Sequence, residues 1–345
     1  MHKEHIACVV LVVVLSAAFV YAQDIFVGKD GNIRNIDARA LVTGQDAFYL
    51  ATRSVVYKTK DMKDDWETVF ALPSGGNEIN CLAGRSNNIF VGTKRGLFRS
   101  EDYGATWRNV FRTILPEKND VLCIYLPDSG GRTLYIGTAR GVFKSDDLGS
   151  RWNDQSGELK NRAVKCITIH NGSMYAGADD GIYARRPGSD GWERLVIKSA
   201  IEKPGDDAPQ LDEVSGETEE NVILASFVVA TPKRLYIGIE RKILYSEDGA
   251  RSWRPFPSEG LAGSINSMLP SALSAKLYCA TTRGVFEFTP EDGHWHELYK
   301  GKEKGFAAND IMFGSSDEKS IWALTDDGLY KFDVGQHMPE QYIDV

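Results

Sequence analysis

The sequence predicts an all-β fold, a seven-bladed β-propeller of four-stranded antiparallel blades. Three observations support this prediction: a Ser-x-Asp-x-Gly-x-x-Trp motif recurs along the chain, an aromatic segment precedes each copy, and tryptophans return at nearly constant intervals. Repeats of roughly 40–45 residues with short strands and tight turns are typical of blade architectures. Beyond the N-terminus, no segment keeps a helical period over about ten residues.

The motif occurs in three well-formed copies, and degenerate units fill the intervals between them. The motif residues are Ser100, Asp102, Gly104 and Trp107; Ser145, Asp147, Gly149 and Trp152; and Ser246, Asp248 and Trp253. The aromatic segments are 48–57, 89–98, 134–143, 174–183, 235–244, 277–286 and 321–330. The repeated tryptophans are Trp66, Trp107, Trp152, Trp192, Trp253 and Trp295, which lie 41, 45, 40, 61 and 42 residues apart. Only the fourth interval departs from a blade-sized repeat.

Each unit divides into four predicted strands, which in the second unit are residues 77–84, 89–93, 96–99 and 107–111. These segments are short, rich in β-branched and aromatic residues, and bounded by Gly, Asn, Ser and Asp. The seventh unit lacks an outer strand after Phe332. We expect residues 24–36 or 341–345 to supply that strand and close the ring.

The motif falls at the predicted turn between the third and fourth strands. There an Asp carboxylate can accept hydrogen bonds from nearby backbone N–H groups, and Gly104 or Gly149 can adopt a positive φ. The Trp then begins the outer strand and packs beneath the turn. A metal-binding or catalytic role for these aspartates is the alternative. Because the same device recurs in several hairpins, whereas a catalytic site is usually unique, we favour the structural role.

These residues resemble the Asp-box (BNR) repeat of sialidase-type and related β-propellers. The phrase Gly-Val-Phe-Lys-Ser-x-Asp-x-Gly-x-x-Trp around residues 141–152 is also similar to photosystem II assembly-factor-like propellers and to xyloglucanase-type glycosidases. The resemblance covers nearly the whole chain after the N-terminal segment. It implies the architecture, but no single activity, because the repeat occurs in enzymes, receptors and assembly factors.

The N-terminus reads as a secretory signal peptide, residues 1–22. A short polar segment with Lys3 precedes an apolar run from Ile6 to Val20, and Val20-Tyr-Ala22 fits the small-residue rule for cleavage after Ala22. An uncleaved anchor is the alternative, although the run is short for a membrane span. We therefore expect a single propeller domain over residues 23–345, secreted or periplasmic and without a membrane span.

The net charge of −8 is concentrated in one segment. Residues 202–220 contain eight acidic residues and one lysine, and they account for the long fourth interval. We expect an acidic flexible insertion there, either a solvated loop or a flap that contacts a partner or an ion. The charge gives no indication of nucleic-acid binding.

Four cysteines follow the signal segment: Cys81, Cys123, Cys166 and Cys279. The first three occupy matching places in successive inner strands, which favours small residues at crowded positions. We expect buried free thiols. Disulfides remain the alternative, since the compartment would permit them.

Arginines recur at the predicted turn between the second and third strands. The turn residues are Arg53, Arg95, Arg140, Arg241 and Arg283, with Asp180 and Asp327 in the two remaining units. Propeller geometry places these turns on the face opposite the motif. They are either solvated turn residues or a ring that binds a carboxylate-bearing or acidic partner.

Catalytic and metal sites have weaker support. The arginines follow the repeat instead of forming a sialidase-type triad, and no motif marks a pair among the candidate glycosidase acids Asp120, Asp128, Asp310 and Asp326. His294 and His296 beside Asp292 suggest a metal only weakly, because further histidines are not nearby.

We therefore expect a monomeric, non-catalytic binding or assembly scaffold that needs no cofactor or metal. It would recognise a protein or glycan partner on the arginine-bearing face. The alternative is a carbohydrate-active enzyme, a sialidase- or xyloglucanase-like glycoside hydrolase.

Overall fold

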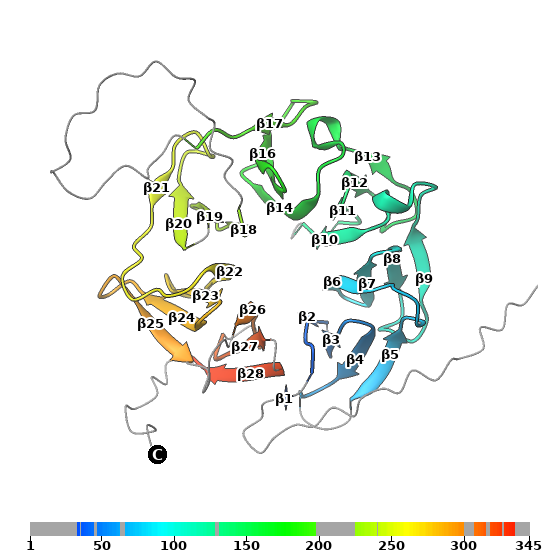
Figure 1. Cartoon of the computed structure of the whole chain (residues 1–345), viewed down its shortest axis with the longest axis horizontal. Coiled ribbons are helices and arrows are strands. Elements are labelled where there is room, and N and C mark those ends of the chain that lie inside the picture. Colours follow the sequence, from blue (N-terminus) through cyan, green and yellow to red (C-terminus); the bar gives the residue numbers. More distant parts are fainter. Residues whose placement is uncertain are drawn as a thin grey trace, which may run out of the picture.

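The structure, a computed structural model, describes residues 33–34, 36–44, 47–62, 66–127, 131–197, 225–239, 241–299, 307–314, 318–325 and 328–334. Seven four-stranded antiparallel sheets stand in a ring around a central channel, as Figure 1 shows. The predicted seven-bladed propeller is thus confirmed. The signal peptide 1–22, its cleavage after Ala22 and the acidic insertion 202–220 lie outside the described residues. Within the described ranges, no helix is long and apolar enough to cross a membrane.

The first four blades follow the chain from the inner to the outer strand. Blade 1 contains β2 (Ala40–Thr43), β3 (Phe48–Ala51), β4 (Val55–Thr59) and β5 (Glu67–Ala71). Blade 2 contains β6 (Ile79–Arg85), β7 (Asn88–Thr93), β8 (Gly96–Ser100) and β9 (Arg108–Phe111). Blade 3 contains β10 (Val121–Tyr125), β11 (Leu134–Thr138), β12 (Gly141–Ser145) and β13 (Asn153–Asp154). Blade 4 contains β14 (Val164–His170), β15 (Ser173–Ala178), β16 (Gly181–Arg185) and β17 (Glu193–Arg194).

The remaining blades repeat this order, and the last one closes the ring. Blade 5 contains β18 (Phe227–Ala230), β19 (Leu235–Ile239), β20 (Lys242–Ser246) and β21 (Arg254–Pro255). Blade 6 contains β22 (Ile265–Pro270), β23 (Leu277–Thr281), β24 (Gly284–Thr289) and β25 (His294–Tyr299). Blade 7 contains β26 (Ala308–Phe313), β27 (Ser320–Thr325) and β28 (Gly328–Asp333), and β1 (Ile33–Arg34) is its outer strand. Two short 3-10 segments, η1 (Pro116–Lys118) and η2 (Gly157–Leu159), lie in connections between blades.

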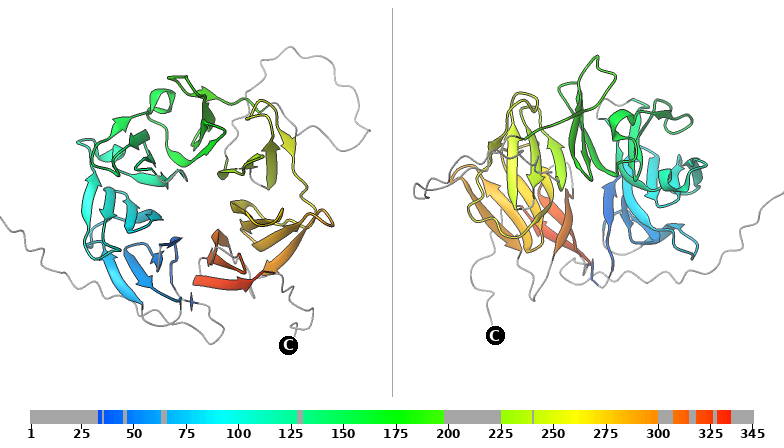
Figure 2. Two further views of the ribbon diagram at one scale, coloured as in Figure 1. Left: turned by 180° about the vertical axis from the view of Figure 1, so that it is seen from behind. Right: turned by 45° about the horizontal axis from the view of Figure 1, so that its top comes forward.

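The N-terminal segment supplies the missing strand of blade 7. Ile33 pairs with Leu329 and Arg34 with Gly328, antiparallel to β28. Of the two predicted segments, 24–36 contains this strand, through Ile33 and Arg34. The first and last described strands therefore lie side by side, as the blue and red ribbons do in Figures 1 and 2.

The hydrophobic core lies between neighbouring blades. In one cluster, Tyr49, Val56 and Phe70 of blade 1 pack against Ile79 and Val91 of blade 2. Second strands such as β15 are buried on both faces, because a blade packs against each side of them. The apolar residues of a blade are therefore covered by the next blade, so each blade depends on its neighbours.

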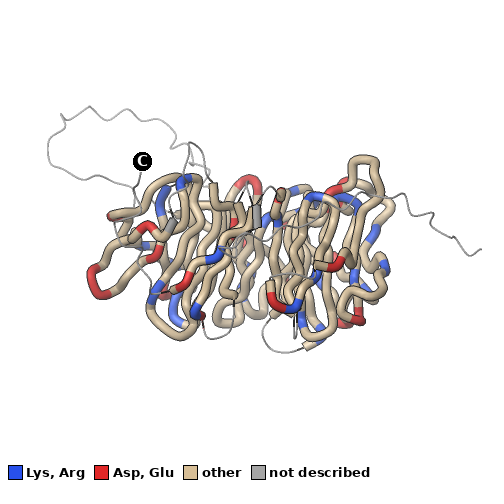
Figure 3. The backbone as a smooth tube through the Cα atoms, turned by 90° about the horizontal axis from the view of Figure 1, so that it is seen from below, with Lys and Arg blue, Asp and Glu red and all other residues tan. Residues whose placement is uncertain are grey.

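The turns lie on two opposite faces of the disc. Figure 3 shows the disc from its side, with charged residues of both signs. We call one the connection face: it carries the turns between second and third strands and the links between blades. Its turns touch the start of their own blade, since Ala139 N–H donates to Asp120 O over 2.9 Å and Thr282 N–H to Ser264 O over 2.9 Å. The motif turns lie on the opposite face, which we call the motif face.

Candidate functional site

The motif aspartates brace the turn between the third and fourth strands, as the sequence predicts. Asp102 Oδ1 accepts a hydrogen bond from Thr106 N–H over 2.8 Å, and Ser100 Oγ donates to the same oxygen over 2.7 Å. Ser100 Oγ in turn accepts from Gly104 N–H over 2.8 Å. Ser145 and Asp147 repeat these contacts in blade 3, as do Ser246 and Asp248 in blade 5. Serine and aspartate thus act as one unit.

Each motif turn needs two successive residues with positive φ. Tyr103 and Gly104 have φ values of 58° and 94°, and Leu148 and Gly149 have 59° and 94°. In the third copy the glycine comes first, with Gly249 at 73° and Ala250 at 67°. Glycine at either position relieves part of the strain, which explains why the third copy tolerates the shifted order.

The hydrogen bonds stabilise the ionised carboxylates. The side-chain bond from Thr106, followed by its backbone bond, lowers the pKa of Asp102 to about 2. The backbone bond from Arg151 lowers the pKa of Asp147. Desolvation raises the pKa of Asp248, but hydrogen bonds from Ser252 and Ser246 outweigh it, so the pKa is lowered. These groups are fixed hydrogen-bond acceptors, and such low pKa values do not suit general acid catalysis at neutral pH.

The motif tryptophan also joins adjacent blades, a role that the sequence analysis missed. Trp107 Nε1 donates to Gly104 O of its own turn over 3.0 Å and to Val69 O of blade 1 over 2.7 Å. Trp152 Nε1 likewise donates to Gly149 O over 3.1 Å and to Val110 O of blade 2 over 2.7 Å. The exception is Trp253, whose buried Nε1 has no hydrogen-bond partner among the described residues.

A second hydrogen bond connects the motif turn to the preceding blade. Tyr49 O–H donates to Tyr103 O over 3.0 Å, and Tyr175 O–H donates to Gly249 O over 3.0 Å. Between blades 2 and 3, Arg99 Nη1 replaces the tyrosine and donates to Leu148 O over 3.0 Å. The motif therefore holds the ring together as well as shaping a hairpin.

The turn arginines lie on the connection face and are exposed. A threonine shapes several of these turns: Thr93 Oγ1 donates to Gly96 O over 2.9 Å and accepts from Arg95 N–H over 3.1 Å. Thr138 and Thr281 make the same pair of bonds beside Arg140 and Arg283. The arginine backbones are thus fixed in a common conformation.

The five arginines differ in what their side chains contact. Arg53 Nε lies 3.5 Å from Glu78 Oε1, and Arg95 Nη2 donates to Gly75 O over 2.6 Å. The guanidinium groups of Arg140, Arg241 and Arg283 make no ion pair or hydrogen bond with the part of the chain that the structure describes. The equivalent Asp180 pairs with Arg162 over 3.0 Å, and Asp327 lies outside the described residues.

Glu78 links blades 1 and 2 at this face. Its carboxylate lies 3.0 Å from Lys94 Nζ and 3.6 Å from Arg39 Nη1, in addition to Arg53. The hydrogen bond from Lys94 lowers the pKa of Glu78, and the charges of Arg53, Lys94 and Arg39 act in the same direction. Arg39 also pairs with Asp37 over 3.4 Å, so two acids offset two of the three positive charges, and one positive charge remains in the cluster.

The candidate catalytic acids are engaged by neighbouring blades. Asp120 Oδ1 accepts a hydrogen bond from Asn80 Nδ2 over 2.7 Å, and Asp310 Oδ1 accepts one from Ser267 Oγ over 2.6 Å. Desolvation raises the pKa of Asp310. Asp128 and Asp326 lie outside the described residues. Each described acid thus has an inter-blade contact that accounts for it structurally.

His294 and His296 lie on β25 beside Asp292, which approaches both rings, and Glu259 also approaches His294. His296 Nε2 lies 2.6 Å from Asp292 Oδ2, and His294 Nε2 lies 3.2 Å from Glu259 Oε2. No group of metal-binding side chains converges on a common point within the described ranges.

The four cysteines are unpaired, as expected, but only Cys279 is buried, whereas Cys81, Cys123 and Cys166 are partly exposed. The sulfur atoms are nevertheless desolvated in all four, since burial raises the pKa of each thiol, so the expected buried free thiols are present although three of the residues are partly exposed. The crowding is also present: a β-carbon built on Gly92 would lie 2.3 Å from Cys81 Sγ, and one on Gly137 would lie 2.6 Å from Cys123 Sγ. Desolvation raises the pKa of Cys81 to about 12, which keeps this thiol protonated and unreactive.

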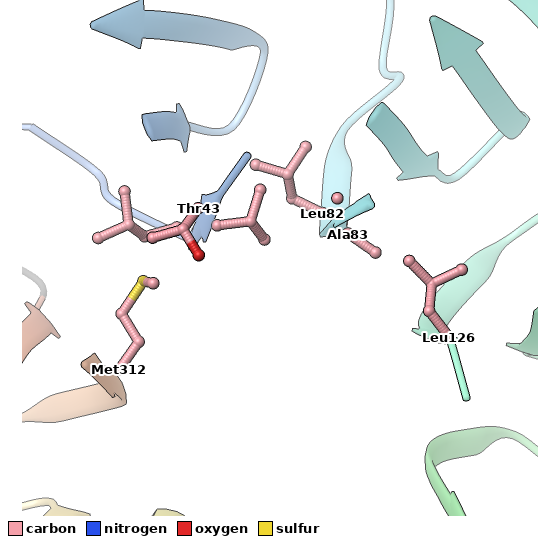
Figure 4. A pocket seen from close by; sticks show the side chains of 8 residues that line it. Thr43, Leu82, Ala83, Leu126 and Met312 are labelled. Atoms are coloured by element: carbon pink, nitrogen blue, oxygen red, sulfur yellow. The ribbon is translucent and has the colours of Figure 1, made fainter. Parts of the chain in front are cut away.

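An apolar hollow of about 320 Å³ opens into the channel near its motif-face end. Figure 4 shows its wall, which comes from the inner-strand side of blades 1, 2, 3 and 7: Leu41, Val42, Thr43, Leu82, Ala83, Gly84, Leu126 and Met312. Since these side chains carry no titratable group, the hollow offers no acid–base chemistry.

No family model matches the chain, and no curated protein matches it. Among solved structures, the chain resembles YCF48 bound to a D1 peptide, with a TM-score of 0.66, 14% identity, and coverage of 88% of this chain and 95% of that one. It also resembles the extracellular domain of a putative one-component system from B. thetaiotaomicron, with a TM-score of 0.67, 14% identity, and coverage of 90% and 39%. An ancestral GH74 enzyme gives a TM-score of 0.61, 16% identity, and coverage of 90% and 46%. At these identities the comparisons establish a shared propeller fold among proteins of different kinds.

Proposed function

We propose that this protein is a non-catalytic binding or assembly scaffold outside the cytoplasm that recognises a carboxylate-bearing partner on its connection face. The observation that carries the proposal is the set of exposed turn arginines Arg140, Arg241 and Arg283, whose guanidinium groups are not engaged by the described residues. Arginine binds carboxylates through two parallel N–H donors, so such groups favour an acidic protein or an acidic glycan.

The fixed turn conformation supports this proposal. Thr138 and Thr281 hold the backbones of Arg140 and Arg283 in the same conformation, so only the side chains must be ordered on binding. Two comparisons are consistent with it: one similar structure is bound to a peptide, and another is an extracellular domain. The N-terminal signal-like segment supports a location outside the cytoplasm.

The test is a charge-reversal experiment with a matched control. Arg95, Arg140 and Arg283 are changed to Glu together in the mature chain. The control changes Arg132, Arg151 and Arg254 to Glu, which are exposed residues away from the connection face. Both variants alter the net charge equally, so general charge effects cancel. Partners should be lost from pull-downs with the first variant and kept with the second, and equal recovery would refute the proposal.

A glycoside hydrolase is the rival function. Asp120 and Asp310 belong to blades 3 and 7, and each is hydrogen-bonded to the preceding blade. These contacts give both carboxylates a structural role. Incubation of the mature chain with xyloglucan and with a sialoside tests the rival directly, because released sugar would favour the enzyme.

A further inference from the structure

The connection between blades 2 and 3 displays two apolar side chains on the connection face. Ile114 is 96% exposed and Leu115 is 44% exposed. Folding normally buries such side chains, and an isolated exposed leucine or isoleucine needs no explanation. Here the two are adjacent, and their loop has two further properties.

The first property is that hydrogen bonds fix the loop. Asn119 is only 6% exposed; its Oδ1 accepts from Thr113 N–H over 2.6 Å and its Nδ2 donates to Thr113 O over 3.1 Å. Thr113 Oγ1 also donates to Leu115 O over 2.9 Å, and η1 follows directly. Ile114 and Leu115 are therefore held outward by a buried asparagine. A side chain presented in this way costs little additional ordering on binding.

The second property is the position of the loop between two arginine turns. At one end, Phe111 pairs with Leu97, immediately after the turn of Arg95. At the other end, Asp120 O accepts from Ala139 N–H, immediately before Arg140. Arg112 lies within the loop and is exposed. The apolar pair thus lies in the same loop as Arg112, between the turns of Arg95 and Arg140, with Glu117 of η1 as the nearest acid along the chain.

We propose that Ile114 and Leu115 are the apolar anchor of the connection face, and that the partner is an acidic polypeptide segment with an apolar residue beside its carboxylates. This inference rests on the proposed function and narrows it, because an acidic glycan offers no comparable apolar side chain. The arginines supply charge complementarity, and the apolar pair supplies buried contact area.

Fluorescence anisotropy with three labelled peptides tests the inference. One peptide alternates Glu and Leu, the second alternates Glu and Ser, and the third alternates Lys and Leu. On the unaltered mature chain, the Glu–Leu peptide should bind about tenfold more tightly than the Glu–Ser peptide, since burial of even part of a leucine is worth that factor. The Lys–Leu peptide should not bind.

Substitution of the anchor should remove this preference. In the double variant Ile114→Ser, Leu115→Ser, the two acidic peptides should bind equally. The matched control is Leu273→Ser, because Leu273 is 67% exposed but lies at the turn after β22, on the motif face. That variant should keep the tenfold preference. Circular dichroism confirms that all variants are folded.

The outcomes separate the anchor from the underlying function. If both acidic peptides bind the unaltered chain equally and charge reversal at Arg95, Arg140 and Arg283 weakens both, the anchor is refuted and the proposed function stands. If neither acidic peptide binds, the anchor is refuted, and the pull-down with the charge-reversed chain decides the proposed function. Tight binding of the Lys–Leu peptide, or binding of phosphatidylserine vesicles that depends on Ile114, would also overturn the anchor, because the partner would then be basic or a lipid surface.

Discussion

Replacing the motif tryptophans one at a time should separate their hydrogen bonds from their packing. Trp107 Nε1 donates to both Gly104 O and Val69 O, whereas Trp253 Nε1 has no partner among the described residues. Both side chains are partly buried against hydrophobic clusters. Trp107→Phe and Trp253→Phe therefore remove similar ring area, but only the first removes hydrogen bonds.

The expected difference follows from the single indole N–H, which both carbonyls share. A typical intramolecular hydrogen bond contributes about 0.5–1.5 kcal/mol net, so the loss at position 107 should be about 0.5–1.5 kcal/mol beyond the packing loss. At position 253 the substitution removes an unpaired buried N–H, which offsets part of the packing loss. Trp107→Phe should consequently lower the free energy of unfolding by at least about 0.5–1.5 kcal/mol more than Trp253→Phe.

Urea unfolding of the mature chain measures this difference. Far-ultraviolet circular dichroism and tryptophan fluorescence should be followed together, because coincident transitions justify the use of a single free energy. Equal losses in the two variants would refute the argument that the indole N–H ties adjacent blades. A larger loss for Trp253→Phe would refute it more strongly.

Two further predictions concern acid stability and ring closure. Because the pKa of Asp102 is lowered from 3.8 to about 2, its stabilising effect is complete above 3.8 and is lost as pH falls through about 2. Asp102→Asn should therefore weaken the dependence of the urea midpoint on pH over this range. An unchanged dependence would contradict the stabilising role of the Asp102 carboxylate in its turn. Deleting residues 24–36 removes β1 and leaves the outer edge of β28 unpaired, so the melting temperature should fall sharply, whereas deleting residues 341–345 should have little effect. An unchanged melting curve after the first deletion would contradict closure by β1.

The repeat made the fold predictable, because every blade uses the same local devices. Four strands, a glycine with positive φ and an aspartate that accepts backbone N–H groups all follow from residues within one unit, and they appear in the structure around Asp102 and Gly104. The predicted strands of the second unit match β6 to β9 within one or two residues.

Contacts between units were harder to predict, because the alignment of repeats does not show which groups meet across a blade boundary. Glu78 and Gly75 engage Arg53 and Arg95 from the connection between blades 1 and 2, whose sequence differs from that of the other connections. The exposure of Ile114 depends on how Asn119 folds the loop. An apolar residue in a connection would ordinarily be assigned to the core.

The spacing of the tryptophans has a physical cause in these inter-blade bonds. The accepting carbonyls belong to Val69, Val110 and Gln155, each three residues after the preceding tryptophan, and to Pro257, four residues after Trp253. The intervals that carry such a bond are 41, 45, 40 and 42 residues. The one interval of 61 residues ends at Trp253, whose indole N–H is unpaired although Leu195 packs in the same cluster. Where the indole N–H of a tryptophan donates to a carbonyl just after the previous tryptophan, this hydrogen bond limits the number of residues between the two tryptophans. Before Trp253, where the hydrogen bond is missing, the interval contains an insertion.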